Sequence, residues 1–259
     1  MNADANRPQP RPRRFTRKYI WRLLRFFLLA LVVVVLGVMV WMANAQVGIY
    51  LQPAPSTVTI PPDLPFTPEV ITFTGGPDAQ TQAPVTLAGW FVPPQNGATV
   101  LLLHGYGGNR TQMRRQAEWL YRAGYGLLLY DERASGESTG SVRSYGWQDV
   151  ADVGGALAFL RGRADVDMTR IGLLGCSIGG MISIRAAAQY PEIRATIADG
   201  PAVVASGDLP PPASWAEWLS VIPNWIIDRM LEARLGQAEP PLVSEVISQI
   251  EPRPLLLIA

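Results

Sequence analysis

Four short apolar runs alternate with amphipathic segments through the middle of the chain. The runs occupy residues 98–105, 124–131, 170–176 and 193–199, and segments with apolar residues at helical spacing lie between them at 111–123, 147–160 and 178–190. Runs without a polar face indicate strands buried on both sides, and intervening helices allow such strands to lie parallel. The sequence therefore predicts an α/β domain with a mostly parallel sheet and helices on both faces.

Further strands are expected on either side of this pattern. Residues 69–74 and 85–92 flank a turn-rich segment, and the sequence stops inside another apolar run, "PLLLIA". Residues 201–252 interrupt the alternation with prolines and three tryptophans, so we expect an insertion there. We predict one domain over residues 69–259. We also predict that the coding sequence continues, because the last run resembles a buried strand that is cut before its end.

An apolar stretch near the N-terminus separates a basic tail from this domain. Residues 26–43 are 18 uncharged, mostly apolar residues, enough to span a bilayer, and tryptophans bracket them as interfacial anchors would. Seven arginines and one lysine stand against one acid up to Arg25, so the positive-inside rule places the tail in the cytoplasm. We expect a cytoplasmic tail at 1–19, a transmembrane anchor at 20–43, and an extracytoplasmic domain in a single-pass cell-membrane protein.

A cleaved signal peptide is the alternative for this stretch. "ANA" at residues 43–45 resembles a small-residue cleavage site, but the apolar core of a signal peptide is shorter than this run, which favours an uncleaved anchor. Both interpretations export the domain. Residues 44–68 are rich in proline and lack helical periodicity, so they predict an extended spacer that holds the domain off the membrane.

Charge and cysteine content exclude several classes of protein. Beyond Arg25 the chain is mildly acidic, so its basic residues form a tail and not the surface of a nucleic-acid-binding domain. Cys176 is the single cysteine, which excludes an internal disulfide and a cysteine-rich metal site. We expect no metal ion, no cofactor and no nucleic-acid partner.

The pattern Gly-x-Ser-x-Gly at Gly175, Ser177 and Gly179 lies between a predicted strand and a predicted helix. The pattern alone recurs by chance, but this context is the one in which a strained turn exposes a serine hydroxyl. The N-terminus of the helix also favours the negative charge that develops during acyl transfer. The context predicts that Ser177 is a nucleophile and not a structural serine.

Three motifs in this order resemble the α/β-hydrolase family. "HGYGG" at 104–108, "YDERASGES" at 130–138 and "GCSIGG" at 175–180 each follow a predicted strand, and the likeness runs from about residue 85 to residue 259. The details look most like membrane-anchored bacterial members related to monoacylglycerol lipases and serine aminopeptidases. The resemblance implies the α/β-hydrolase fold, with residues 201–252 as a small helical cap.

The resemblance also implies roles for individual residues. Ser177 would attack an acyl carbonyl, and the backbone N–H groups of Ile178 and Tyr106 would form the oxyanion hole. Gly175 and Gly179 would permit the nucleophile elbow. Cys176 is expected to be a small buried filler.

The sequence offers no evident base for Ser177. His104 is the only histidine and belongs to the oxyanion loop, and the only lysine, Lys18, lies in the predicted cytoplasmic tail. In the family the acid and the histidine follow the nucleophile, so we expect an acid-bearing turn and a histidine beyond Ala259. Asp199 is the one candidate acid within the chain, although a loop-structuring role is favoured.

Two more features have open interpretations. Asp131 and Arg133 are predicted to form a charged pair that orders the loop beneath the site, with substrate binding by Arg133 as the alternative. Tryptophans and aliphatic residues recur at helical spacing in the insertion. They predict either an acyl-chain wall or the packing face of the cap, at residues Trp215, Trp218, Leu219, Ile222, Trp225, Ile226, Ile227 and Met230.

The sequence thus predicts an exported, membrane-anchored serine hydrolase that acts on an apolar, small-molecule carboxylic ester through an acyl-enzyme on Ser177. Small amides are a further substrate class. One alternative is an exported serine peptidase of the same fold. The other is a non-catalytic binding domain that has the elbow and lacks the catalytic histidine. Without that histidine and the strand that would cover the last apolar run, the 259-residue product is expected to be inactive and to aggregate.

Overall fold

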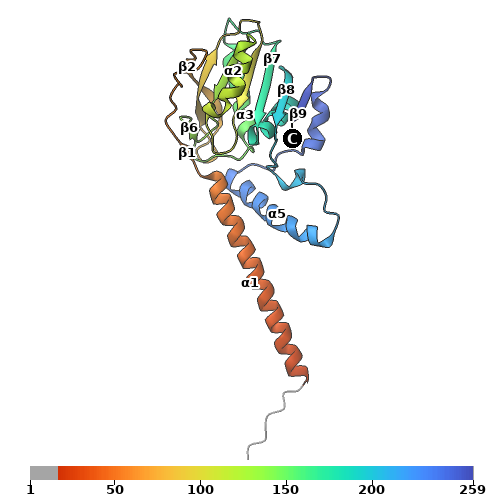
Figure 1. Ribbon diagram of the computed structural model, residues 1–259. Coiled ribbons are helices and arrows are strands. Elements are labelled where there is room, and N and C mark those ends of the chain that lie inside the picture. The colour runs from red at the N-terminus through yellow and green to blue at the C-terminus, as the bar shows by residue number, and fades with distance from the viewer. Residues whose placement is uncertain (1–16, 259) are drawn as a thin grey trace, which may run out of the picture. The chain divides into compact units, whose positions relative to one another are not determined.

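The chain divides into two compact units, residues 1–42 and residues 43–259. The structure is a computed structural model that describes residues 17–258 (Figure 1). Helix α1, Arg17–Leu51, begins in the first unit and ends in the second. By length and composition it is apolar enough to cross a membrane, and the side chains of its most apolar window are not buried in the protein.

The second unit is built on a seven-stranded sheet in the order β2-β3-β5-β4-β7-β8-β9. Strands β2 and β3 pair antiparallel, as do β3 and β5, whereas all later pairs are parallel. The predicted α/β architecture is therefore confirmed. The strand bounds are β2 Glu69–Pro77, β3 Pro84–Val92, β4 Thr99–Leu103, β5 Gly126–Tyr130, β7 Ile171–Cys176, β8 Ile193–Asp199 and β9 Leu255–Ile258.

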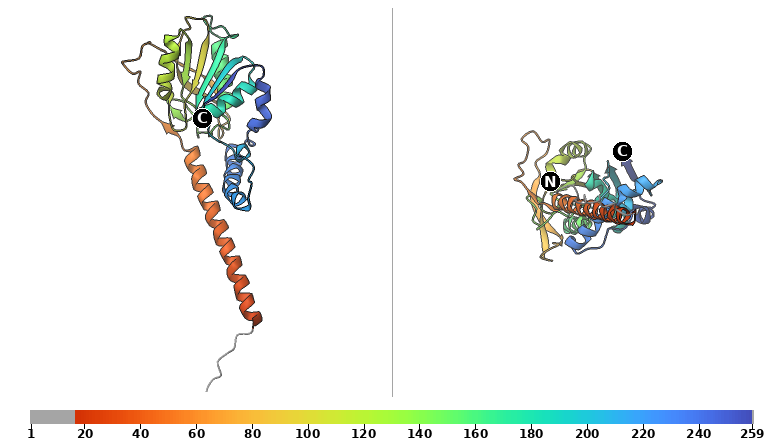
Figure 2. Two further views of the ribbon diagram at one scale, coloured as in Figure 1. Left: turned by 45° about the vertical axis from the view of Figure 1, so that its right-hand side comes forward. Right: turned by 90° about the horizontal axis from the view of Figure 1, so that it is seen from below.

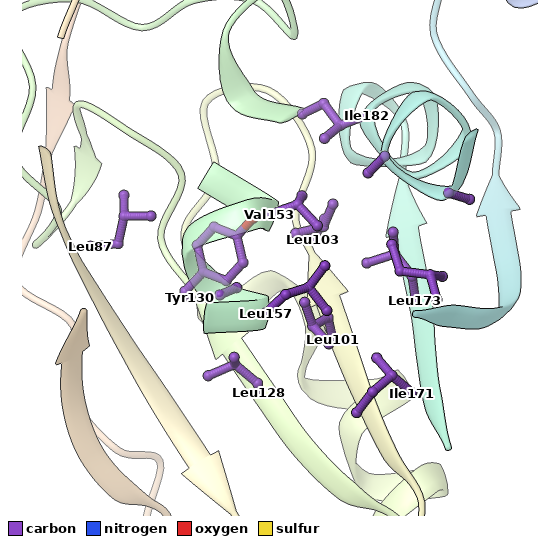
Figure 3. Packing of buried hydrophobic residues seen from close by; sticks show 14 of the residues in the cluster. Leu87, Leu101, Leu103, Leu128, Tyr130, Val153, Leu157, Ile171, Leu173 and Ile182 are labelled. Carbon is purple, nitrogen blue, oxygen red and sulfur yellow. The ribbon is translucent and has the colours of Figure 1, made fainter. Parts of the chain in front are cut away.

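Helices cover both faces of this sheet because successive side chains of each strand point to opposite faces. Leu101 and Leu103 of β4 belong to the core on the side of α3, Asp149–Arg161, and α4, Ile178–Gln189. Leu102 between them belongs to the core under α2, Arg114–Arg122, which follows a 3-10 turn at Arg110–Met113. Figure 3 shows the first of these cores, where Val153 and Leu157 of α3 meet Leu101, Leu103 and Leu128.

The insertion after β8 forms a 3-10 turn at Ser206–Asp208, a long helix α5 at Trp215–Leu235, a short α6 at Val243–Val246 and a 3-10 turn at Ile247–Ile250. Ser214 caps α5 by accepting a hydrogen bond from the N–H of Glu217, and Gly236 ends it in the left-handed conformation. In Figure 2, α5 lies beyond the end of the sheet, whereas α6 lies beside the sheet. Trp215, Trp218 and Trp225 are 78%, 63% and 55% exposed, so within the described chain they do not form the packing face of the insertion.

The prediction of an extended spacer at residues 44–68 is wrong for residues 44–51. Helix α1 continues to Leu51, and the strand β1, Ala54–Pro55, then pairs in parallel with β6, Ser135–Gly136. Phe66 is buried in the core under α2. The prolines keep the segment extended, but it is packed along the domain and does not hold the domain at a distance.

Strand β9 also differs from its prediction. The run "PLLLIA" was expected to be a buried strand, but Leu256, Leu257 and Ile258 are 54%, 53% and 43% exposed. The reason is position: β9 is the last strand in the sheet order and pairs only with β8 among the described residues.

Candidate active site

Ser177 occupies a sharp turn between β7 and α4. Its backbone has φ 56° and ψ −118°, a conformation that costs a non-glycine residue about 1–3 kcal/mol and persists only where surrounding contacts impose it. Those contacts are on both sides of the residue. The Ser177 N–H donates to the carbonyl of Asp199 over 2.8 Å, and the Ser177 carbonyl accepts from the N–H groups of Gly180 and Ala202 over 3.0 and 3.1 Å.

The two glycines of the motif are required by close backbone approach. A β-carbon on Gly175 would lie 2.0 Å from the carbonyl oxygen of Gly179. One on Gly179 would lie 2.6 Å from the carbonyl oxygens of both Leu103 and His104. Gly179 therefore lets α4 start directly against the end of β4, which brings the loop after β4 to the serine.

That loop contains the second predicted half of the oxyanion hole. A β-carbon on Gly105 would lie 3.3 Å from Cβ of Ser177, so the residue before Tyr106 is in contact range of the nucleophile. The Gly105 N–H donates to Oε1 of Gln112 over 2.7 Å, which fixes the loop. Ile178 is the first residue of α4, where backbone N–H groups have no partner within the helix. Tyr106 and Ile178 thus flank Ser177 from two elements.

His104 is fully engaged in holding this loop. Its Nδ1 donates to the carbonyl of Gly105 over 2.8 Å, and its Nε2 accepts from the N–H of Glu132 over 3.0 Å. Burial lowers the pKa of the imidazole, which favours the neutral form that these two bonds require. With both nitrogens occupied inside the protein, His104 has no free nitrogen with which to take the proton of Ser177.

Asp131 and Arg133 are buried and structural, but they are not paired with each other as predicted. Asp131 accepts from the backbone N–H and the guanidinium of Arg110, over 2.7 and 2.6 Å. Arg133 donates twice to Asp152 of α3, each time over 2.7 Å. Both residues follow the end of β5 at Tyr130, where strand alternation no longer applies, and each finds its partner on a different element, the 3-10 turn for Asp131 and α3 for Arg133. Arg133's Nε and both of its terminal nitrogens make four hydrogen bonds to the protein, and its side chain is buried, so the structure favours the structural role over substrate binding.

Asp199 and Cys176 lie side by side at the ends of β8 and β7. The Asp199 backbone carbonyl binds Ser177, whereas its side chain lines a hollow with Trp119 of α2 and Ile258. Cys176 is half-buried, and burial together with the nearby Asp199 carboxylate raises the pKa of its thiol. These positions fit the structural roles that the sequence favoured for both residues.

The last turn of α1 is part of this neighbourhood, which sequence reasoning missed. The Tyr106 hydroxyl donates to the carbonyl of Ile49 over 2.6 Å and accepts from Arg143 over 2.7 Å. The Tyr50 ring stacks on Tyr145 at 3.8 Å between centroids. Because the last carbonyls of a helix lack partners within it, Arg143 and Tyr106 act as a cap for α1. No local signal links Ile49 to a residue 57 positions later.

A cavity of about 160 Å³ adjoins these rings. Tyr50, Tyr145 and Val203 line one part of it, and Asn224 and Asp228 of α5 line another. Ser177 is not among the residues that line this cavity; its link to the elbow is Gly146, next to Tyr145, where a β-carbon would lie 3.5 Å from the side chain of Ile178.

Two buried carboxyl groups in the domain were also missed by the sequence analysis. Burial raises the pKa of Asp228, which accepts from the N–H of Ser206 over 2.8 Å at the cavity wall. Burial raises the pKa of Glu132 well above its ordinary value, and one of its carboxyl oxygens has no hydrogen-bond partner among the described residues. A carboxyl group in such surroundings is favoured in its neutral form.

Comparison with known proteins decides the family. Residues 94–249 match the family model described as serine aminopeptidase, S33, which is more than half of the chain. The chain belongs to the serine aminopeptidase S33 family. This membership shows an α/β-hydrolase and confirms the resemblance that the three motifs indicated.

Individual relatives of this S33 chain agree with that class. It is 26% identical to the Pyrococcus furiosus esterase Pf2001, with a TM-score of 0.58, covering 80% of this chain and 76% of the esterase. It is 39% identical over 100 residues to the uncharacterized protein YfhR of Salmonella typhimurium, covering 36% of this chain and 34% of YfhR. It is 32% identical over 126 residues to the polyketide transferase ATR5 of Stachybotrys chlorohalonatus, covering 47% and 42%. The chain thus spans between a third and a half of these curated relatives.

Proposed function

We propose that the protein is a membrane-anchored, exported serine hydrolase that cleaves carboxylic esters through an acyl-enzyme on Ser177. The observation that carries this proposal is the left-handed backbone of Ser177, held between β7 and α4 with Gly105 against it. A strained serine costs stability, and its benefit is an exposed hydroxyl beside two sets of backbone donors. Esterase Pf2001, the solved relative described above, supports an ester as the substrate.

In this mechanism Ser177 Oγ attacks the acyl carbon, and the carbonyl oxygen gains negative charge. The N–H groups of Tyr106 and Ile178 would stabilise that oxyanion, each contributing about 3–4 kcal/mol in related sites. A general base has to remove the serine proton first. Because His104 is bonded at both nitrogens, we place the base and its acid partner outside the described residues.

Fluorophosphonate labelling tests the nucleophile in the full-length protein. Ser177→Ala should abolish labelling together with the hydrolysis of p-nitrophenyl butyrate, whereas Ser248→Ala, which changes an exposed serine, should alter neither. Asp199→Asn should keep most of the activity if its side chain is only structural. Labelling that persists in Ser177→Ala would remove Ser177 as the nucleophile.

The same assay separates the alternatives. If the full-length protein fails both tests while folded, a non-catalytic binding domain becomes the better conclusion. Faster turnover of an amino-acid p-nitroanilide than of the ester would favour the peptidase.

A further inference from the structure

Helix α5 has an apolar face that no described part of the protein covers. We call Trp215, Trp218, Ile222 and Trp225 its tryptophan face, because their spacing of three, four and three residues places them on one side of the helix. Trp215 and Trp218 are the two most exposed aromatic side chains among the described residues of the second unit, and Trp225 is also exposed. Residues 218–227 contain no charged side chain. A contiguous apolar patch of this kind marks an interaction surface.

The opposite face of α5 fixes the helix to the domain. Leu231 and Leu235 are buried against Val47, Leu51 and Trp147. Val47 and Leu51 belong to the last two turns of α1, so α5 is held directly by the continuation of the apolar N-terminal helix. Arg234 of α5 reinforces this contact by donating to the side chain of Asn44 over 2.5 Å.

Chain connectivity then limits how far α5 can lie from the membrane. The apolar run ends at Ala43, and Val47, four residues later, is already buried against α5. Four residues span at most about 14 Å when fully extended. If the run ends at the surface of the bilayer, the C-terminal end of α5 is within that distance of the surface at any angle between the two units. A helix of 21 residues is about 30 Å long, so its N-terminal half lies at the interface when α5 runs along the surface and not away from it.

We propose that the tryptophan face of α5 lies in the lipid–water interface of the membrane that holds the anchor of the same chain. Tryptophan is the residue best suited to this position, because its ring is apolar and its N–H can remain with the headgroups. The charged residues of the second half of α5 are Asp228, Arg229, Glu232 and Arg234. Of these, Arg229 continues the tryptophan face by one turn, with its guanidinium over the Trp225 ring at 5.9 Å, and such a side chain can extend toward lipid headgroups.

This arrangement names a substrate class for the site and rests on the proposed anchoring and ester hydrolysis. One side of α5 contacts lipid, while Asn224, Ile227 and Asp228 on its other side line the cavity beside the elbow. An amphiphilic acyl ester dissolved in the same leaflet would therefore reach the cavity around one helix. The preferred substrates are esters that partition into the membrane.

Lipid-borne quenchers test the contact in the full-length protein reconstituted into phosphatidylcholine vesicles. In a Cys176→Ala background, single cysteines at Trp218, Trp119 and Val34 carry a bimane fluorophore. Trp119 is the matched control, because it is an equally exposed tryptophan on α2. Spin-labelled lipid should quench bimane at position 218 several-fold more than at position 119, and position 34 reports insertion of the anchor.

The outcomes separate this inference from the proposed anchoring. Quenching at 34 without quenching at 218 overturns the inference alone, and no quenching at either position overturns the anchoring as well. Bimane at position 218 could instead be protected from water-soluble iodide and yet not be quenched by spin-labelled lipid. That result would mean that protein covers the tryptophan face, either a second copy or another segment of the chain, and it would also overturn the inference.

Activity gives a second, independent readout. Replacing Trp215, Trp218 and Trp225 together by serine should lower hydrolysis of a vesicle-borne long-chain ester several-fold and leave a water-soluble butyrate ester unchanged. Equal loss on both substrates would contradict the inference, because it would indicate damage to the cap. If the protein with its native tryptophans does not hydrolyse the butyrate ester, the proposed function fails. The quenching result still decides whether the tryptophan face contacts lipid.

Discussion

At the scale of the residue, the elbow around Ser177 depends on backbone groups that leave no room for a β-carbon. We expect Gly175→Ala to destabilise the protein by roughly 3 kcal/mol, because its new methyl group would lie 2.0 Å from a carbonyl oxygen that cannot move without shifting α4. Gly172→Ala in the same strand is the control, since its nearest contact is a side-chain methyl of Val100 at 3.3 Å. Urea unfolding in detergent compares the two, and equal midpoints would contradict the argument.

His104 should remain neutral to a lower pH than a free histidine does. Burial lowers its folded-state pKa below the unfolded value near 6.5, so the unfolded chain binds the extra proton first. Stability should therefore fall as the pH drops below about 6.5, by at most about 1.4 kcal/mol per pH unit from this group, and His104→Asn should lose that contribution.

Because the 259-residue chain has a single histidine, nitrogen-15 NMR in detergent can follow the protonation state of the His104 imidazole without overlap. One imidazole with a protonated Nδ1 is expected at neutral pH, and it should stay neutral to a lower pH than a free histidine does. An imidazole that titrates near pH 6.5 would instead show that His104 is accessible and would reopen its candidacy as a base.

Sequence reasoning located the elbow correctly because its signal is local. The Gly-x-Ser-x-Gly spacing and the adjoining strand and helix are all contained in residues 171–189. It failed for the partner of Arg133, because that partner is Asp152 on a helix 19 residues away. Which buried carboxylate meets a buried arginine depends on how α3 packs, and no spacing rule encodes that.

At the scale of the element, the end of α1 supports the loop after β4, in which Tyr106 is the proposed oxyanion donor. Arg143 donates to the carbonyl of Gln52 and to the Tyr106 hydroxyl, and its guanidinium stacks on the Tyr106 ring at 4.1 Å. Arg143→Ala should lower kcat about tenfold, the size of one lost positioning hydrogen bond, with little change in KM for a short ester. Arg143→Lys should recover part of the lost kcat.

Arg114→Ala is the matched control for this prediction. Arg114 makes ion pairs with Asp63 and Glu118 near the surface of α2 and should not affect kcat. A wild-type kcat for Arg143→Ala would show that Tyr106 is held without it, and a rise in KM alone would assign Arg143 to substrate binding instead.

The strands and helices of the sheet were predictable because burial on both faces leaves uninterrupted apolar runs. The continuation of α1 from Gln46 to Leu51 was not predictable from the sequence. Its six residues hold two apolar anchors, Val47 and Leu51, whose partners are Trp147, Leu231 and Leu235 far along the chain. Prolines from Pro53 onward then made the whole segment look extended.

At the scale of the whole molecule, β9 presents an apolar edge strand to its surroundings. The backbone groups of such a strand can pair with another copy, and Leu257 adds an exposed apolar side chain at 53%. We expect the 259-residue chain to self-associate in mild detergent, and Leu257→Lys to shift it toward the monomer. Sedimentation velocity measures this. A monodisperse parent chain would contradict the expectation.

The burial of Val47 four residues after the apolar run leaves no room for a flexible tether. Under the proposed anchoring, an enzyme held in this way would search for a membrane-borne ester in two dimensions. Its rate would then depend on the density of the ester in the leaflet and not on its concentration in bulk solution. Diluting an ester with inert lipid at constant total ester should slow turnover in proportion to its surface mole fraction. Adding buffer to the same vesicles should leave turnover per enzyme unchanged.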